Sequence, residues 1–181
     1  MRKILLLFLL ISISCKDDVL PKPKAYLSLD YPIQQYKKLT LERPYTFEIS
    51  NQAIPENLPN NWMNIKYPKL KASVDITYRE VDDNLQELLL ESEKLVYKHT
   101  QKADQIIAKD FSNPNKRVFG TIHEITGNAA SQIQFHLTDS TNHFLKGALY
   151  FHIKPNYDSV LPAVEYIKKD IQKLMESMEW K

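Results

Sequence analysis

Three apolar segments joined by very short connections constrain the fold more than any other feature of this sequence. They are residues 117–125, 131–138 and 143–153, separated by five and then four residues. Parallel strands need a crossover of a dozen or more residues, whereas antiparallel neighbours can be joined by a short turn. The three segments therefore predict an antiparallel meander.

Both faces of this meander carry apolar side chains. Ile133, Phe135 and Leu137 alternate along the second segment and form one face. The opposite face also contains large apolar residues, which are Phe119, Phe144, Ala148 and Tyr150. We therefore expect other elements to cover the sheet on both sides, at least in part.

More strands and two helices are predicted around the meander. Residues 45–49, 62–67 and 72–78 alternate as strands do, with a polar, proline-containing loop at 50–61. From Leu85 the apolar spacing changes to i, i+3, i+4, which predicts a helix that reaches about Lys109. The same helical spacing recurs near the end of the chain, at Val160, Val164, Ile167, Ile171, Leu174 and Met178.

The predicted order is three strands, a helix, three strands and a second helix. This order indicates the α+β class, with an antiparallel sheet of about five to six strands packed with two long helices, βββα-βββα. In the order of its elements alone, the chain resembles the PsbP-like sandwich fold. The large aromatic Trp180, almost at the terminus, is expected to dock into the domain.

The first residues have the pattern of an export signal. Arg2 and Lys3 precede an apolar run from Ile4 to Ile13, which is too short to cross a bilayer as a stable helix. The run ends just before Cys15, the one cysteine, in a setting that resembles the lipobox of lipoproteins. We expect residues 1–14 to be removed and Cys15 to carry lipid. The alternative is an ordinary secreted protein with a stray cysteine.

Charge argues against one large class of partners. The chain has 24 Lys and Arg against 22 Asp and Glu, and loss of Arg2 and Lys3 brings the two counts level at 22. A neutral domain without a basic stripe lacks what nucleic-acid binding requires. Membrane attachment is expected to come from the lipid, since two acyl chains suffice for stable anchoring.

Prolines and tyrosines dominate the segment after the cysteine. Residues 15–44 contain Pro21, Pro23, Pro32 and Pro44, so the sequence predicts a lipidated, extended arm there and a single α+β domain at 45–181. Tyr26, Tyr31 and Tyr36 either pin the arm to its own domain or form a recognition strip for a partner, and pinning is favoured.

Glycine is scarce. Only Gly120, Gly127 and Gly147 occur, and they stand apart, so no phosphate-binding loop or dinucleotide fingerprint can be assembled. No CxxC or Cys/His cluster is present to hold zinc. We therefore expect no cofactor, and we expect the glycines to mark turns.

Residues 138–143 combine a hydroxyl, a carboxylate and an imidazole. A hydrolytic site is one interpretation, although no GxSxG elbow accompanies it. The same residue types satisfy the backbone of a tight hairpin, which is the favoured interpretation.

The histidines raise the question of a metal. His123, His136 and His152 lie on adjacent predicted strands, but no HxH or HExxH spacing brings two of them together. His99 follows the apolar stripe of the first predicted helix and is expected to be a hydrogen-bonded core residue. No metal site is therefore expected.

Residues 97–104, 127–131 and 138–151 together resemble the gliding-motility lipoprotein GldD family of Bacteroidetes. The resemblance extends over nearly the whole chain and includes the lipoprotein signal and residues 21–24, 29–32 and 179–181. It implies an envelope lipoprotein needed for gliding and associated with the type IX secretion apparatus, with no established catalytic activity. Lys146 departs from the family pattern, in which arginine is common.

These observations favour an interaction and assembly factor and not an enzyme. Its expected partners are other gliding-motility and type IX secretion lipoproteins and membrane proteins, with the outer membrane as the location and its periplasmic face favoured over the cell surface. Loops on a rigid sheet often carry binding. The candidate partner surface is therefore Asn128, Asp139, Ser140, Thr141, His143 and Lys146.

Two other functions remain open from the sequence. One is an envelope glycan hydrolase or ligand-binding domain that uses the turn from Asp139 to His143. The other is a metal-binding sensor built on the histidines.

Overall fold

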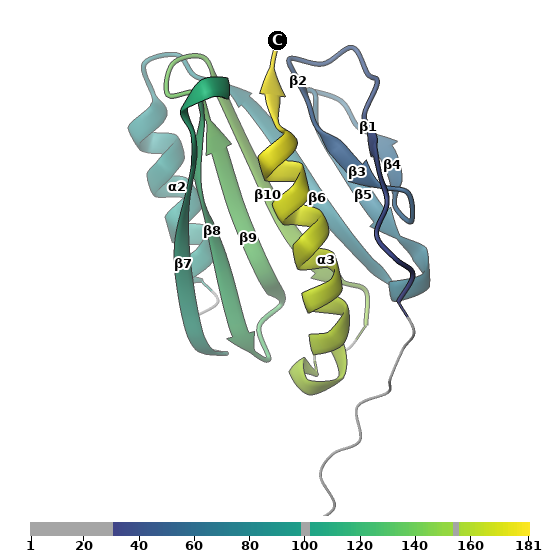
Figure 1. Cartoon of the computed structure of the whole chain (residues 1–181). Coiled ribbons are helices and arrows are strands. Elements are labelled where there is room, and N and C mark those ends of the chain that lie inside the picture. Colours follow the sequence, from purple (N-terminus) through teal and green to yellow (C-terminus); the bar gives the residue numbers. More distant parts are fainter. Residues whose placement is uncertain (1–30, 99–101, 154–155) are drawn as a thin grey trace, which may run out of the picture.

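The computed structural model describes residues 31–98, 102–153 and 156–181. Its centre is a seven-stranded antiparallel sheet with one long helix in front and one behind (Figure 1). The order across the sheet is β4 (Ile54–Asn57), β5 (Met63–Tyr67), β6 (Ala72–Glu80), β10 (His143–Phe151), β9 (Ser131–Thr138), β8 (Val118–Gly127) and β7 (Ala103–Asn113). The α+β class is confirmed.

The predicted meander forms the middle of this sheet. Strand β9 pairs with β8 on one side and with β10 on the other, and both pairings are antiparallel. Strand β6 then pairs along the whole of β10. A 3-10 turn, η1 (Pro68–Leu70), joins β5 to β6. The short connections thus led to the correct neighbours.

The first predicted helix is shorter than its periodicity indicated. Helix α2 runs only over Leu85–Tyr97, and residues 103–113 form the edge strand β7. Ala103 and Ile106 pack against Val96 of α2, but they do so as residues of strand β7 and not as a continuation of the helix. Pairing with β8 over its whole length gives β7 a ladder of hydrogen bonds, and this tertiary gain overrides the local pattern.

The predicted loop at 50–61 contains another strand. β4 pairs with β5 at the sheet edge, where Pro55 is tolerated because its missing N–H faces away from the ladder. Together with β7, this strand raises the sheet from the expected five to six strands to seven.

Two small sheets lie beside α3 (Tyr157–Ser177) in front of the main sheet (Figure 1). β1 (Tyr36–Lys38) pairs with β3 (Glu48–Ser50), and β2 (Tyr45–Thr46) pairs with the terminal strand β11 (Glu179–Trp180). The strand predicted at 45–49 is therefore two short strands with the fully buried Phe47 between them.

The main core lies between α3 and the front face of the sheet. Ile167, Ile171 and Leu174 of α3 are buried against the inward-facing residues of the central strands. Those residues include Val74, Ile76, Ile133, Phe135, Leu137, Leu145 and Leu149. The alternation in the sequence placed each of them on this face correctly.

Two of the three glycines do not mark turns. Gly127 ends β8 with φ +91°, a conformation that favours glycine. Gly120 and Gly147 instead lie inside strands where a neighbour approaches too closely for a side chain. A Cβ at Gly147 would lie 2.2 Å from Cζ of Phe135.

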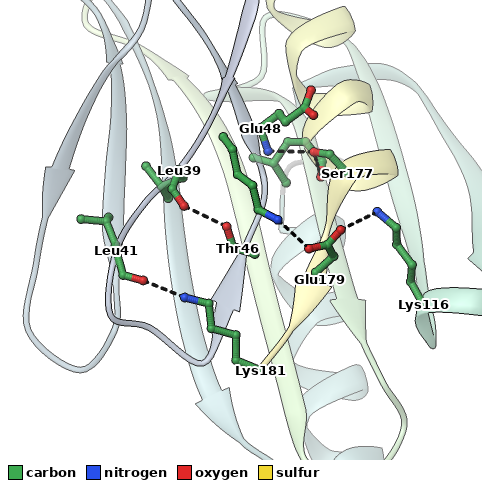
Figure 2. A network of polar contacts seen from close by, with 10 residues as sticks. Leu39, Leu41, Thr46, Glu48, Lys116, Ser177, Glu179 and Lys181 are labelled. Atoms are coloured by element: carbon green, nitrogen blue, oxygen red, sulfur yellow. Dashed lines mark hydrogen bonds and ion pairs between the residues drawn. The ribbon is translucent and has the colours of Figure 1, made fainter.

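The carboxyl end of the chain holds the amino-terminal segments in place (Figure 2). Glu179 forms ion pairs with Lys38 at 2.9 Å and with Lys116 at 3.1 Å. Lys181 donates from Nζ to the carbonyl of Leu41, and Trp180 donates from Nε1 to the carbonyl of Arg117. The expected docking of Trp180 is confirmed.

The described part of the arm lies against α3. Tyr31 stacks on Tyr166 with ring centroids 4.7 Å apart, and the Tyr166 hydroxyl donates to the carbonyl of Pro32. Gln34 donates to Asp170 at 2.8 Å, and Lys173 lies over the ring of Tyr36. Pinning is therefore confirmed for Tyr31 and Tyr36.

Several predictions fall outside the described residues. These are the signal at 1–14, the lipidation of Cys15, the placing of Tyr26, and the core role of His99. Within the described segments, neither helix is long and apolar enough to span a bilayer.

Candidate functional site

The hairpin between β9 and β10 is stabilised by Asp139. Its Oδ1 accepts the backbone N–H groups of Thr141, Asn142 and His143 at 2.8 to 3.0 Å, and its Oδ2 accepts the Thr141 hydroxyl. Burial would raise the pKa of Asp139, but these hydrogen bonds outweigh burial and hold it at about 2. Both carboxylate oxygens are thus engaged within the turn.

The other residues of this hairpin also hold its shape. Ser140 occupies a left-handed conformation with φ 69°, and its N–H donates to the Thr138 hydroxyl. The Thr138 hydroxyl in turn donates to the carbonyl of His143. The favoured interpretation of residues 138–143, a demanding turn, agrees with these contacts.

His143 belongs to an aromatic stack and not to a catalytic pair with Asp139. Its Nδ1 lies 2.8 Å from the Tyr78 hydroxyl, and its ring stacks on Trp180 with centroids 5.1 Å apart. The backbone N–H of His143, and not its ring, contacts Asp139. The imidazole therefore joins β10 to β6 and to the end of the chain.

Asn128 lies at the other end of the sheet. It follows β8, whereas the 138–143 turn follows β9, and antiparallel neighbours have successive turns at opposite ends. The eight residues of β9 separate the two turns by roughly 26 Å. The Asn128 side chain accepts the N–H of Tyr157 at 2.9 Å and so supports the start of α3.

Lys146 faces a third direction. Along β10 it alternates with Leu145 and Gly147, which face the main core, so its side chain lies on the opposite face, the one that carries α2. The six predicted residues therefore do not form one surface. Lys146 lines a sizeable cavity.

This cavity is a groove of about 580 Å³ beside α2, within the range typical of ligand pockets. Its floor is the back face of β6 and β10, one wall is α2, and the other is the connection between β4 and β5. The side chains that line it include Asn60, Trp62, Asp75, Thr77, Arg79, Glu91, Leu95, Lys146 and Tyr150. We call it the α2 groove.

The groove contains four charged groups, three of which have ion-pair or hydrogen-bond partners inside the protein. Arg79 pairs with Glu91 at 3.1 Å and ties β6 to α2. Asp75 accepts the hydroxyl of Ser73 at 2.8 Å. Lys146 is half-buried and forms no hydrogen bond or ion pair with any residue in the described ranges. Burial lowers the pKa of its ammonium group.

Trp62 forms the apolar rim of the groove. Its indole N–H donates to the carbonyl of Tyr78 at 3.1 Å, which fixes the ring, and 39% of the residue is exposed. On the α2 side, the half-buried Leu95 lines the groove. Accessible apolar side chains on both sides of a polar groove are typical of a contact surface.

Two of the three candidate metal ligands lie together on the back face of the sheet, which carries α2. His123 and His136 are 6% and 7% exposed, and the Nδ1 atom of each has no hydrogen-bond partner among the described residues. Burial lowers the pKa of both, and that of His136 falls to about 4. His152 lies beyond the end of β10, and no group of three metal-binding side chains occurs in the described segments.

Residues 16–180 match the family model described as gliding motility lipoprotein GldD. The chain belongs to this family. The match confirms the resemblance noted in the sequence, and it supports a role in gliding motility for a lipid-anchored protein of the cell envelope. No curated protein sequence matches the chain significantly.

Sequence reasoning for this GldD family member missed most of the groove. Trp62 and Asp75 were seen only as strand residues, and Arg79 and Glu91 were not singled out. One signal was available, because the alternation in 72–78 sets Asp75 and Thr77 opposite the apolar positions. Nothing in the sequence indicated that α2 leaves this part of the sheet uncovered.

Proposed function

We propose that this GldD family member is a lipid-anchored assembly factor that stabilises or positions other gliding and type IX secretion components. It acts by contact and not by catalysis, from the periplasmic face of the outer membrane. The observation that carries this proposal is the α2 groove, where a half-buried lysine without an ion-pair partner among the described residues shares a cavity with the apolar side chains of Trp62 and Leu95.

The chemistry of the hairpin supports contact over catalysis. A general acid or base must present a free carboxyl or imidazole group to its substrate. Asp139 accepts four hydrogen bonds inside its own turn, and His143 lies between Tyr78 and Trp180. These residues stabilise the fold, which leaves the α2 groove as the better place for a partner.

The proposal is tested by isolating the intact, lipidated protein from gliding cells with mild detergent. We expect gliding and type IX secretion lipoproteins to be recovered with it. We also expect the amounts of those proteins to fall in cells that lack this chain, and to return on complementation. Recovery of no motility or secretion component would overturn the proposal.

Protease treatment tests the location. The folded domain should be protected in intact cells and digested once the outer membrane is permeabilised. Digestion in intact cells would instead place the domain on the cell surface and overturn the periplasmic assignment.

A further inference from the structure

Lys146 is an unusual cation because the groove partly buries it without supplying an anion. Partial burial of an ammonium group costs solvation free energy, which an ion pair normally offsets. Glu91 attracts Lys146 across the groove, but its carboxylate is paired with Arg79 at 3.1 Å. Asp75 accepts from Ser73, and no ion pair joins it to Lys146. The position opposite Lys146 therefore suits an anion from outside.

The surroundings of Lys146 favour a side chain of a protein over a free ion. A cavity of about 580 Å³ is far larger than one carboxylate needs. Trp62 presents its ring on one rim, and Leu95 lies one turn from Glu91 on the helix that forms the other wall. A segment crossing the groove would cover both apolar side chains while it placed an acidic residue over Lys146.

We propose that the α2 groove binds an acidic segment of a partner protein, with an Asp or Glu carboxylate paired to Lys146 and flanking apolar residues packed on Trp62 and Leu95. This proposal rests on the assembly role and specifies the chemistry of the partner. A lysine at this position pairs as a point charge, so an arginine is expected to serve as well.

The first test compares variants in the isolation from gliding cells. Lys146→Glu should lower partner recovery at least about tenfold, since it places two like charges in contact in a partly desolvated site. Lys146→Arg should retain recovery. Lys169→Glu is the matched control, because Lys169 is an exposed lysine on α3, on the other side of the sheet, and it should have no effect.

The second test uses a carbodiimide, which joins an amine to a carboxylate only when the two are in contact. The wild-type protein should give a cross-link between Lys146 and an Asp or Glu of the partner, located by mass spectrometry. Lys146→Arg should bind the partner without this cross-link, because a guanidinium group does not react. Trp62→Ala should weaken both recovery and cross-linking.

The outcomes separate this inference from the proposed function. Full partner recovery with Lys146→Glu, in a variant whose thermal unfolding matches Lys169→Glu, would overturn the inference and leave the assembly role intact. Recovery of no partner by the wild-type protein would overturn both. Loss of binding to envelope polysaccharide, with all protein partners retained, would show that the groove binds a glycan and would also overturn the inference.

Discussion

Replacing Gly147 with alanine should create a steric conflict that a second substitution relieves. Gly147 lies opposite Phe135 in the β9–β10 pairing, and a Cβ there would lie 2.2 Å from Cζ and 2.3 Å from Cε1 of the ring. Non-bonded carbon atoms normally approach to about 3.5–4.0 Å. Phe135 is 1% exposed and packs in the main core, so its ring cannot move into solvent.

The size of the effect follows from two opposing contributions. Forcing an extra methyl group into a packed core costs about 1–3 kcal/mol. Alanine gains about 0.5–1 kcal/mol over glycine inside a strand, because the unfolded glycine chain has more freedom to lose. The overlap with the ring is more than 1 Å, which places the cost in the upper part of its range. We expect Gly147→Ala to lower the free energy of unfolding by about 2 kcal/mol.

Phe135→Leu should remove the conflict, because leucine lacks the three ring atoms nearest to the new methyl group, Cζ, Cε1 and Cε2. In that background Gly147→Ala should be neutral or stabilising. Gly120→Ala is the matched control. Its Cβ would meet the backbone carbonyl of His136 at 1.9 Å, so its cost should persist when Phe135 is shortened.

Urea unfolding at pH 7, followed by far-ultraviolet circular dichroism, measures each free energy and completes the double-mutant cycle. The m-values should agree among the variants, so that the midpoints report stability alone. An equal loss from Gly147→Ala in both backgrounds would refute the reasoning, as would a gain in stability in the wild-type background.

Four further predictions concern the buried histidine, the hairpin turn and the aromatic stack. Burial lowers the pKa of His136 from 6.5 to about 4, so as the pH falls this residue takes up a proton in the unfolded chain before it does so in the folded protein. Its contribution to stability is therefore complete above pH 6.5 and is lost as the pH drops toward 4. The loss between pH 7 and pH 5 should be about 2 kcal/mol in urea titrations, and an equally steep fall in His136→Gln would contradict this assignment. Asp139→Ala should lower the free energy of unfolding by about 2 kcal/mol, because it leaves N–H groups of the turn unpaired. Ser140→Gly should raise the free energy of unfolding by about 0.5 kcal/mol, because the φ of Ser140 is 69°. A melting temperature that rises in Asp139→Ala or falls in Ser140→Gly would contradict this account of the turn. Trp180→Ala should cost about 2 kcal/mol through loss of the His143 stack, and an unchanged melting temperature would mean that the terminus is not docked in solution.

Most of the sheet could be predicted because its signals are local. In β9 and β10, the alternation of apolar residues and the short turns specify both the strands and their pairing. The 103–113 segment could not be predicted in this way. Ala103 and Ile106 fit a helical stripe as well as a strand, and only pairing with β8 decides between the two. Strand β4 could not be predicted either, because Pro55 is compatible with a strand only at a sheet edge, and the edge position is decided by tertiary pairing with β5.

The candidate site was predicted less well than the fold. The role of Lys146 in partner contact stays a prediction, and the sequence grouped it with Asn128 and Asp139, which lie in two different turns at opposite ends of β9. Residues that are close in the sequence lie on one surface when they share a turn, whereas Asn128 and Asp139 are separated by the length of β9. The residues that line the α2 groove come from the β4–β5 connection, β6, α2 and β10, and no local pattern relates them.

The sequence by itself determined what each segment prefers and which family the chain belongs to. Periodicity, turn residues and the family match depend only on the order of residues along the chain. The tertiary structure alone decided where glycine was required and how much of the sheet α2 covers. It also decided that a cavity lies beside Lys146 on the back face of β10. These features depend on packing between segments far apart in the chain, because the space beside a side chain is set by whatever neighbour the fold brings there.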